Sequence, residues 1–188
     1  MWLPGAQVWF IAGLLSWVTN GVQAKATILS YCSFPVFYKT ILNAEENYQL
    51  LPSGGASIEY VPDQGISVKF STNSLVLNPT TPQGPILQME FTWNTTQQML
   101  YYDLSNIDGA PFAENGMLLQ PSTDASSKYN TCLTVGCAAN STVCPSVYTV
   151  PDGNNTMVCG PSTDLTLSLC TSIPIPHWIR HLRPGQLP

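Results

Sequence analysis

Apolar and polar residues alternate with a period of two along several stretches of the chain. The clearest are residues 66–70, 87–93 and 165–169. In a strand this period places one face on a core and the other toward water, so each stretch predicts a half-buried β-strand. No stretch has a convincing helical period. Further strands are predicted at 26–32, 36–40, 57–61, 99–104 and 147–150.

Turn signals separate the predicted strands at intervals typical of a β-sandwich or barrel. They are Ser53-Gly54-Gly55, Asp63-Gln64-Gly65, Asn78-Pro79, Gln83-Gly84-Pro85, Asp108-Gly109 and Asp152-Gly153. The chain has no internal repeat and no sign of a second domain. We therefore predict an all-β fold, a single sandwich of roughly ten strands.

The N-terminal 24 residues resemble a secretory leader. They contain no Asp, Glu, Lys or Arg and carry an apolar run at 8–15. A membrane anchor is the rival interpretation, but the run is shorter than the roughly 18–20 apolar residues of a span. Small residues at Val22 and Ala24 fit signal-peptidase cleavage after Ala24. We expect a signal peptide at 1–24, a domain at 25–172, and an extracellular, secreted protein without an integral membrane span in the mature chain.

Cysteines and sequons agree with a secretory route. All six cysteines follow residue 24, which predicts three disulfides, although six cysteines allow fifteen pairings. Three Asn-x-Ser/Thr triplets are glycosylation acceptors on that route. They begin at Asn94, Asn140 and Asn154.

The charge balance excludes some partners. Charged residues are 9% of the chain, and eleven acids against six bases give a net charge of −5. This argues against nucleic acid and anionic membranes as partners. Both arginines and both histidines lie in a proline-rich basic segment at 173–188, which we expect to be an unstructured appendage outside the domain.

Residues 101–109 read Tyr-Tyr-Asp-Leu-Ser-Asn-Ile-Asp-Gly. They resemble the Y-D-[VI]-S-[LN]-[VI]-D-G segment of thaumatin-like proteins, secreted β-sandwiches with an acidic cleft. The stretches at 26–37, 87–92, 132–145 and 165–170 also resemble that family's first strands, L-A-E-F segment, C-x(4)-C-A-A…C-P stretch and closing strand. The resemblance implies a jelly-roll-like thaumatin-like β-sandwich. With three disulfides and no cysteine-rich second domain, the chain is most similar to short fungal members such as the Blastomyces yeast-phase-specific group.

The resemblance also implies pairings and a site. By correspondence it pairs Cys32 with Cys170 and Cys132 with Cys159. The family's partners for the remaining two cysteines are absent, which leaves Cys137 with Cys144. The acids that match the family's cleft are Glu90, Asp103 and Asp108.

Three interpretations of these acids stay open. They could bond turn amides, bind carbohydrate, or hydrolyse a glycan as a pair of carboxyls flanking the scissile bond. The family's cleft arginine falls near Ser71, which is not basic, and its remaining cleft aspartate would lie in the missing domain. Tyrosines are candidate sugar platforms. They are Tyr31, Tyr38, Tyr48, Tyr60, Tyr101, Tyr102, Tyr129 and Tyr148.

Other chemistries are disfavoured. No histidine precedes residue 177, which argues against Ser-His-Asp and Cys-His catalysis. His177 and His181 have the spacing of a helical metal pair, but the neighbouring prolines disfavour a helix, so we predict no metal site and no cofactor.

We therefore expect a monomeric, secreted, non-catalytic protein at or near the cell wall. Its predicted partner is a cell-wall glycan (β-glucan) or a surface receptor, bound through an acidic face that carries Glu90, Asp103 and Asp108. The alternatives are a weak endo-β-1,3-glucanase and an antifungal or host-interaction effector or antigen.

Overall fold

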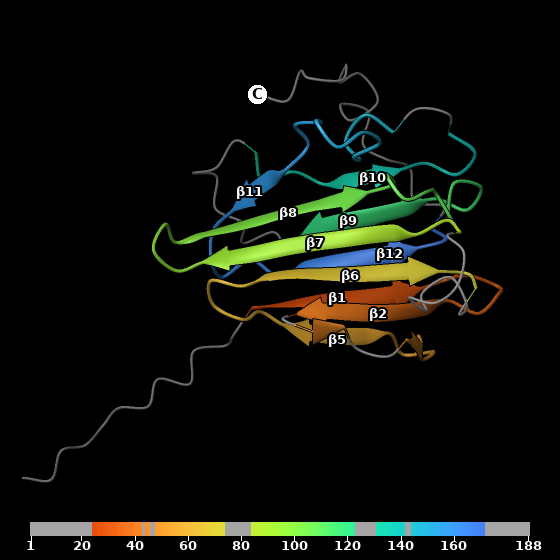
Figure 1. Ribbon diagram of the computed structural model, residues 1–188, viewed down its shortest axis with the longest axis horizontal. Helices are drawn as coiled ribbons and strands as arrows, with labels where there is room; N and C mark the ends of the chain where they lie inside the picture. Colours follow the sequence, from red (N-terminus) through yellow and green to blue (C-terminus); the bar gives the residue numbers. More distant parts are fainter. Residues whose placement is uncertain are drawn as a thin grey trace, which may run out of the picture.

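The computed structural model describes residues 24–42, 44–45, 48–73, 84–122, 131–141 and 144–171. Within these ranges the chain forms strands and no helix, so no described helix could cross a membrane. The strands lie in two sheets packed face to face (Figure 1). The predicted signal peptide up to residue 23 and the basic tail lie outside the described residues.

One sheet has five strands in the order β10-β9-β12-β1-β5. Its first and last members along the chain, β1 and β12, are parallel neighbours, so the two ends of the domain meet side by side. The remaining pairs are antiparallel. The strands are β1 (Lys25–Ser30), β5 (Ala56–Glu59), β9 (Met117–Pro121), β10 (Val135–Cys137) and β12 (Leu165–Leu169).

The other sheet has seven strands in the order β11-β8-β7-β6-β2-β3, with β4 also pairing with β2. An antiparallel meander of β6, β7 and β8 lies at its centre (Figure 1). The strands are β2 (Phe37–Leu42), β3 (Ala44–Glu45), β4 (Gln49–Leu50), β6 (Gly65–Ser71), β7 (Leu87–Asn94), β8 (Met99–Ser105) and β11 (Met157–Cys159).

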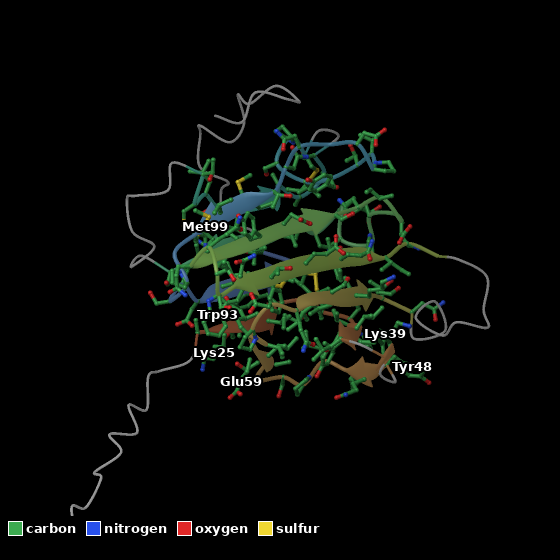
Figure 2. All side chains as sticks on the ribbon, turned by 60° about the vertical axis from the view of Figure 1, so that its left-hand side comes forward. Lys25, Lys39, Tyr48, Glu59, Trp93 and Met99 are labelled. Carbon is green, nitrogen blue, oxygen red and sulfur yellow. A yellow bond between two sulfur atoms is a disulfide. The ribbon has the colours of Figure 1, made fainter. Side chains whose placement is uncertain are left out.

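The core lies between the sheets and is built by the alternating residues. Val68, Met89 and Leu104 from one sheet, with Ile28 and Leu167 from the other, are completely buried. Burying each such side chain contributes roughly 1.5–3 kcal/mol. Figure 2 shows side chains on both sheets, with Trp93 and Lys39 toward opposite ends of the sandwich.

Three disulfides cross-link the domain, and one of them joins its two ends. They join Cys32 to Cys170, Cys132 to Cys159 and Cys137 to Cys144, which are the pairs that the resemblance implies. The first closes a loop of 138 residues. In the chain-entropy model a loop of that length stabilises the fold by about 5 kcal/mol.

The prediction of a strand at 147–150 is wrong. This segment forms bends and touches β8 through a single bridge, from Tyr148 to Ser105. Asn155 donates its Nδ2 to the carbonyl of Val147, at 3.0 Å, so a side chain takes an acceptor that a ladder would otherwise use. Pro145 and Pro151 on either side also limit ladder donors.

Candidate functional site

The outer face of the seven-stranded sheet carries the sequence-predicted acids. Strand register places Ser67 opposite Glu90, and Glu90 opposite Asp103. Their chain neighbours Val68, Met89 and Leu104 point into the core, so these three polar side chains form one row on the outside. Directly opposite residues have Cβ atoms about 4.5–5.5 Å apart, so the two carboxyl groups are neighbours.

Asp103 is partly buried and incompletely bonded. Its Oδ1 atom is shielded from water and has no hydrogen-bond partner among the described residues. Burial is the largest cause that raises the pKa of Asp103, to about 7, and the charge of Glu90 raises it further. A hydrogen bond from the side chain of Thr156 acts in the opposite direction. The pair therefore retains a proton at mildly acidic pH.

Two tyrosines flank this pair. The hydroxyls of Tyr148 and Thr156 lie 2.9 Å apart, so Tyr148 reaches Asp103 through Thr156. On β8, Tyr101 precedes Asp103 by two residues and shares its face, and its hydroxyl donates to Gln97 Oε1 at 2.7 Å. Both rings are half-buried, so part of each is open to solvent.

A glycine makes room for one of these rings. A Cβ at Gly153 would lie 2.8 Å from Cδ1 of Tyr148, closer than carbon atoms tolerate. The Asp152-Gly153 turn signal therefore has a packing function, because the absence of a side chain lets the Tyr148 ring lie against the backbone.

Asp108 joins the same face from the turn after β8. Its side chain is exposed, and its Oδ2 accepts a hydrogen bond from Gln88 Nε2 at 3.2 Å. Gln88 lies two residues before Glu90 on β7. The described partner of the Asp108 carboxylate is thus a side chain of the face, not a turn amide. We call the outer surface carrying Glu90, Asp103 and Asp108 the acidic face.

Gly109 fixes the turn that presents Asp108. Its φ is +110°, and a Cβ there would lie 2.7 Å from Cα of Pro85. The backbone also holds the turn, because Ile86 N donates to Asp108 O at 3.1 Å. Glycine is therefore required at position 109 by the positive φ and by the close approach of Pro85.

A hollow borders the acidic face on the side away from Tyr148. It has a volume of about 310 Å³ and lies between β2, β6 and β7, with Ser67, Glu90 and Thr92 among its lining residues. The Oγ atom of Ser67 is shielded and has no hydrogen-bond partner among the described residues. Gly65, opposite Thr92, contributes no side chain to fill the surface.

Ser71, where the resemblance leads one to look for an arginine, has a structural role. It is fully buried, and its hydroxyl donates to Pro85 O at 3.1 Å. Lys69 supplies a positive charge on the outer face instead, opposite Gln88. The described residues contain no cluster of three or more His, Cys, Asp or Glu suited to a metal ion.

The three sequon asparagines and the remaining tyrosines lie in different environments. Asn94 ends β7 and accepts from Gln97 N at 2.7 Å, Asn140 has a φ of +56°, and Asn154 is exposed. Tyr60 and Tyr102 are core residues, Tyr38 stacks on Phe70, Tyr31 and Tyr48 are exposed away from the row, and Tyr129 lies outside the described residues.

Sequence reasoning missed several polar members of the acidic face. Thr156, Gln88 and Ser67 were not singled out, because each is an ordinary polar residue whose role depends on its neighbours across the sheet. The alternation along β6 and β7 marked Ser67 and Gln88 as outward-facing. The sequon at Asn154 includes Thr156, but no sequence signal placed Thr156 beside Asp103.

Comparison with known proteins places the chain in a family. The profile of the Blastomyces yeast-phase-specific protein family matches residues 15–171. An antigenic thaumatin-like protein of Arthroderma benhamiae is 34% identical over 126 residues, which are 66% of this chain and 52% of that protein. The secreted thaumatin-like protein calA of Emericella nidulans is 30% identical over 131 residues, 68% of this chain and 63% of that protein.

The chain spans about half to under two thirds of the length of these relatives. Among solved structures, it is similar to the protein elicitor MoHrip2 of Magnaporthe oryzae, with a TM-score of 0.58 and 20% identity over 79% of this chain and 99% of that one. At this identity the likeness concerns the fold. The family match and the thaumatin-like relatives together show that the chain belongs to the Blastomyces yeast-phase-specific protein family and is a secreted fungal thaumatin-like protein.

Proposed function

We propose that this protein binds cell-wall polysaccharide, specifically β-glucan, through the acidic face and without hydrolysing it. The observation that carries the proposal is the Glu90–Asp103 pair on the outer face of the sheet, with the half-buried Tyr101 on the same strand as Asp103 and the half-buried Tyr148 in contact with Thr156. Carboxylates accept hydrogen bonds from sugar hydroxyls, and tyrosine rings pack on the apolar faces of pyranose rings.

The dimensions of the face favour an extended ligand. Neighbouring strands are about 4.8 Å apart, so the width from β6 to the edge beyond β8 is comparable to two or three sugar units. Three features follow one another along that line: the hollow at Ser67, the pair Glu90–Asp103, and the contact of Thr156 with Tyr148. A chain laid across the strands would meet hydrogen-bonding groups and an aromatic ring in sequence.

A weak endo-β-1,3-glucanase is the second candidate. The raised pKa of Asp103 favours it, because a carboxyl protonated near neutral pH can act as a general acid. Against it, glycosidases place their two carboxyls on either side of the scissile bond. Here Glu90 and Asp103 stand side by side on one sheet surface. We therefore favour binding over hydrolysis.

A host-interaction role is compatible with the binding proposal. One relative is named as an antigenic thaumatin-like protein. A surface that holds wall polysaccharide would also keep a secreted antigen near the cell that released it. Direct recognition of a host receptor is the alternative in which glucan is not the partner.

Pull-down on insoluble β-1,3-glucan tests the proposal, with cellulose, chitin and xylan as competing matrices. We expect retention on glucan that falls at least fivefold in Glu90→Gln, Asp103→Asn and Tyr101→Ala. Glu59→Gln is the matched control, since Glu59 is an exposed acid of the other sheet (Figure 2). Equal retention of all four variants would reject the acidic face as the binding surface.

Reducing-sugar release from β-1,3-glucan between pH 4 and pH 8 separates the two candidates. The binding proposal predicts no turnover at any pH. Turnover that disappears in both Glu90→Gln and Asp103→Asn would establish the glucanase and overturn the non-catalytic assignment.

A further inference from the structure

The segment entering β11 continues the pleat of the strand. Asn154 is exposed, Asn155 is 9% exposed, Thr156 is exposed and Met157 is buried, an alternation that β11 then carries on. Such alternation places Asn154 and Thr156 on the outer surface of the sheet. This is the surface on which Asp103 lies, because Met157 pairs with the inward-facing Tyr102.

A buried amide fixes which residues of this segment face outward. The Nδ2 of Asn155 donates to the carbonyl of Val147 at 3.0 Å in the interior. Turning the segment over would leave that amide and that carbonyl unpaired, and an unpaired buried polar group is strongly unfavourable because it has given up its bonds to water. Asn154 and Thr156 are therefore held toward solvent.

Thr156 has two roles at once. It is the third residue of the Asn154-Asn155-Thr156 sequon, and its side chain bonds the carboxylate of Asp103. Residues two apart in a strand share a face and have Cα atoms about 6.5–7 Å apart. The acceptor amide of Asn154 is thus about one pleat from the threonine that touches the acidic pair.

With Asn140, Asn154 is one of the two sequon asparagines that are exposed. Its side chain is exposed and makes no hydrogen bond to the described residues. By contrast, the Oδ1 of Asn94 is already engaged with Gln97 N, and Asn140 has a left-handed backbone conformation.

We propose that Asn154 carries an N-linked glycan whose first sugars lie over the border formed by Thr156 and Tyr148, and that this glycan limits access to the Glu90–Asp103 pair from the β11 side. The glycan arrives from a lipid-pyrophosphate-linked oligosaccharide. A bond forms between Asn154 Nδ2 and C1 of the first sugar, the C1–oxygen bond to the pyrophosphate breaks, and the amide nitrogen loses a proton. The identity of the polymer that is excluded rests on the proposed function, whereas modification and shielding do not.

Glycopeptide mapping tests the modification on the full chain secreted from a eukaryotic host. We expect the peptide containing Asn154 to carry a glycan that is lost in Asn154→Gln and in Thr156→Ala. Thr156→Ser should retain it, because serine keeps both the sequon and the hydroxyl. An unmodified Asn154 in the secreted wild-type protein would overturn the proposal.

Carboxyl labelling tests the shielding without any glucan. With a water-soluble carbodiimide and glycine ethyl ester, labelling of Glu90 and Asp103 should rise at least twofold in Asn154→Gln over wild type. Glu59 labelling should not change, and Asn140→Gln should match wild type. Equal labelling of Glu90 and Asp103 in glycosylated protein and Asn154→Gln would reject shielding.

A soluble β-1,3-glucan probe then links the glycan to binding. We expect Asn154→Gln to bind it severalfold more tightly than the glycosylated protein. If neither form binds the probe, the proposed function fails while the labelling result still decides whether the glycan covers the acidic pair.

Discussion

At the scale of single residues, Asp103 couples the acidic face to pH. Burial, followed by the charge of Glu90, raises the pKa of Asp103 to about 7. A carboxyl of this kind binds its proton more tightly in the folded than in the unfolded chain. Between the unfolded pKa near 4 and the folded pKa near 7, the folded state holds more protons, so its stability falls as pH rises through that window.

Asp103→Asn removes this dependence, because an amide does not titrate. We expect the wild-type unfolding free energy to drop by roughly 2–4 kcal/mol from pH 4 to pH 8 relative to the variant, at about 1.4 kcal/mol per pKa unit. Denaturant unfolding at the two pH values measures it, with Glu59→Gln as the control. If the unfolding free energies of wild type and Asp103→Asn change equally with pH, the pKa of Asp103 does not differ between the folded and unfolded chain.

The contact between Gly153 and Tyr148 gives a second prediction at this scale. Gly153→Ala should displace the ring, since the new Cβ would lie 2.8 Å from Cδ1. We expect a loss of about 1–3 kcal/mol, the usual cost of overpacking. Glucan retention should fall with it as the contact between Tyr148 and Thr156 loosens. Gly54→Ala is the control, because nothing lies within 4 Å of the Cβ that this alanine would add.

At the scale of elements, consecutive tyrosines on β8 point to opposite faces of the sheet. Tyr102 faces inward, and its hydroxyl donates to Leu133 O at 2.6 Å, which ties the strand to the segment before β10. Burial raises the pKa of Tyr102, so the hydroxyl stays protonated and remains a donor. Tyr101 faces outward beside Asp103.

These opposite orientations predict that one substitution affects mainly stability and the other mainly glucan retention. Tyr102→Phe should lower the unfolding free energy by about 1–2 kcal/mol, because the carbonyl of Leu133 loses a buried donor, and should leave glucan retention unchanged. Tyr101→Ala should reduce retention with a smaller effect on stability. Thermal denaturation and pull-down on the same samples decide the matter. A loss of binding in Tyr102→Phe alone would reverse the assignment of the two faces.

At the scale of the whole molecule, the Cys32–Cys170 disulfide joins the ends of the domain beside the parallel pair of β1 and β12. We expect Cys32→Ser with Cys170→Ser to destabilise the fold by about 5 kcal/mol, and Cys137→Ser with Cys144→Ser by about half as much, following loop length. Denaturant midpoints of the two double variants provide the comparison. Equal losses would show that loop closure is not the main source of stability.

The basic tail remains a prediction. Truncation after Thr171 should leave the melting temperature within a few degrees, because Cys170 follows the last strand and prolines come after it. Calorimetry on the truncated and full chains tests this. A large drop would mean that Trp178 and Ile179 pack on the sandwich.

The sequence by itself determined the sheet faces and most of the long strands. Alternation at 66–70, 87–93 and 165–169 is sufficient because a strand with one apolar face has a single favourable orientation on a core. Short strands such as β10 and β11 escaped notice, since three residues are too few to show a period. The prediction at 147–150 failed because its apolar residues lie in bends, where Val147 is buried and Val150 is exposed, and not in a ladder.

The sequence predicted only some of the residues of the candidate site. The motif resemblance pointed to Glu90, Asp103 and Asp108, and alternation marked Glu90 as outward-facing. Tertiary structure alone decided that Glu90 stands opposite Asp103 and that Thr156 and Tyr148 border the pair. It thereby also placed Asn154, one pleat from Thr156, near the pair. The physical reason is register: side-chain period follows from local sequence, whereas the partner across the sheet depends on how distant strands align.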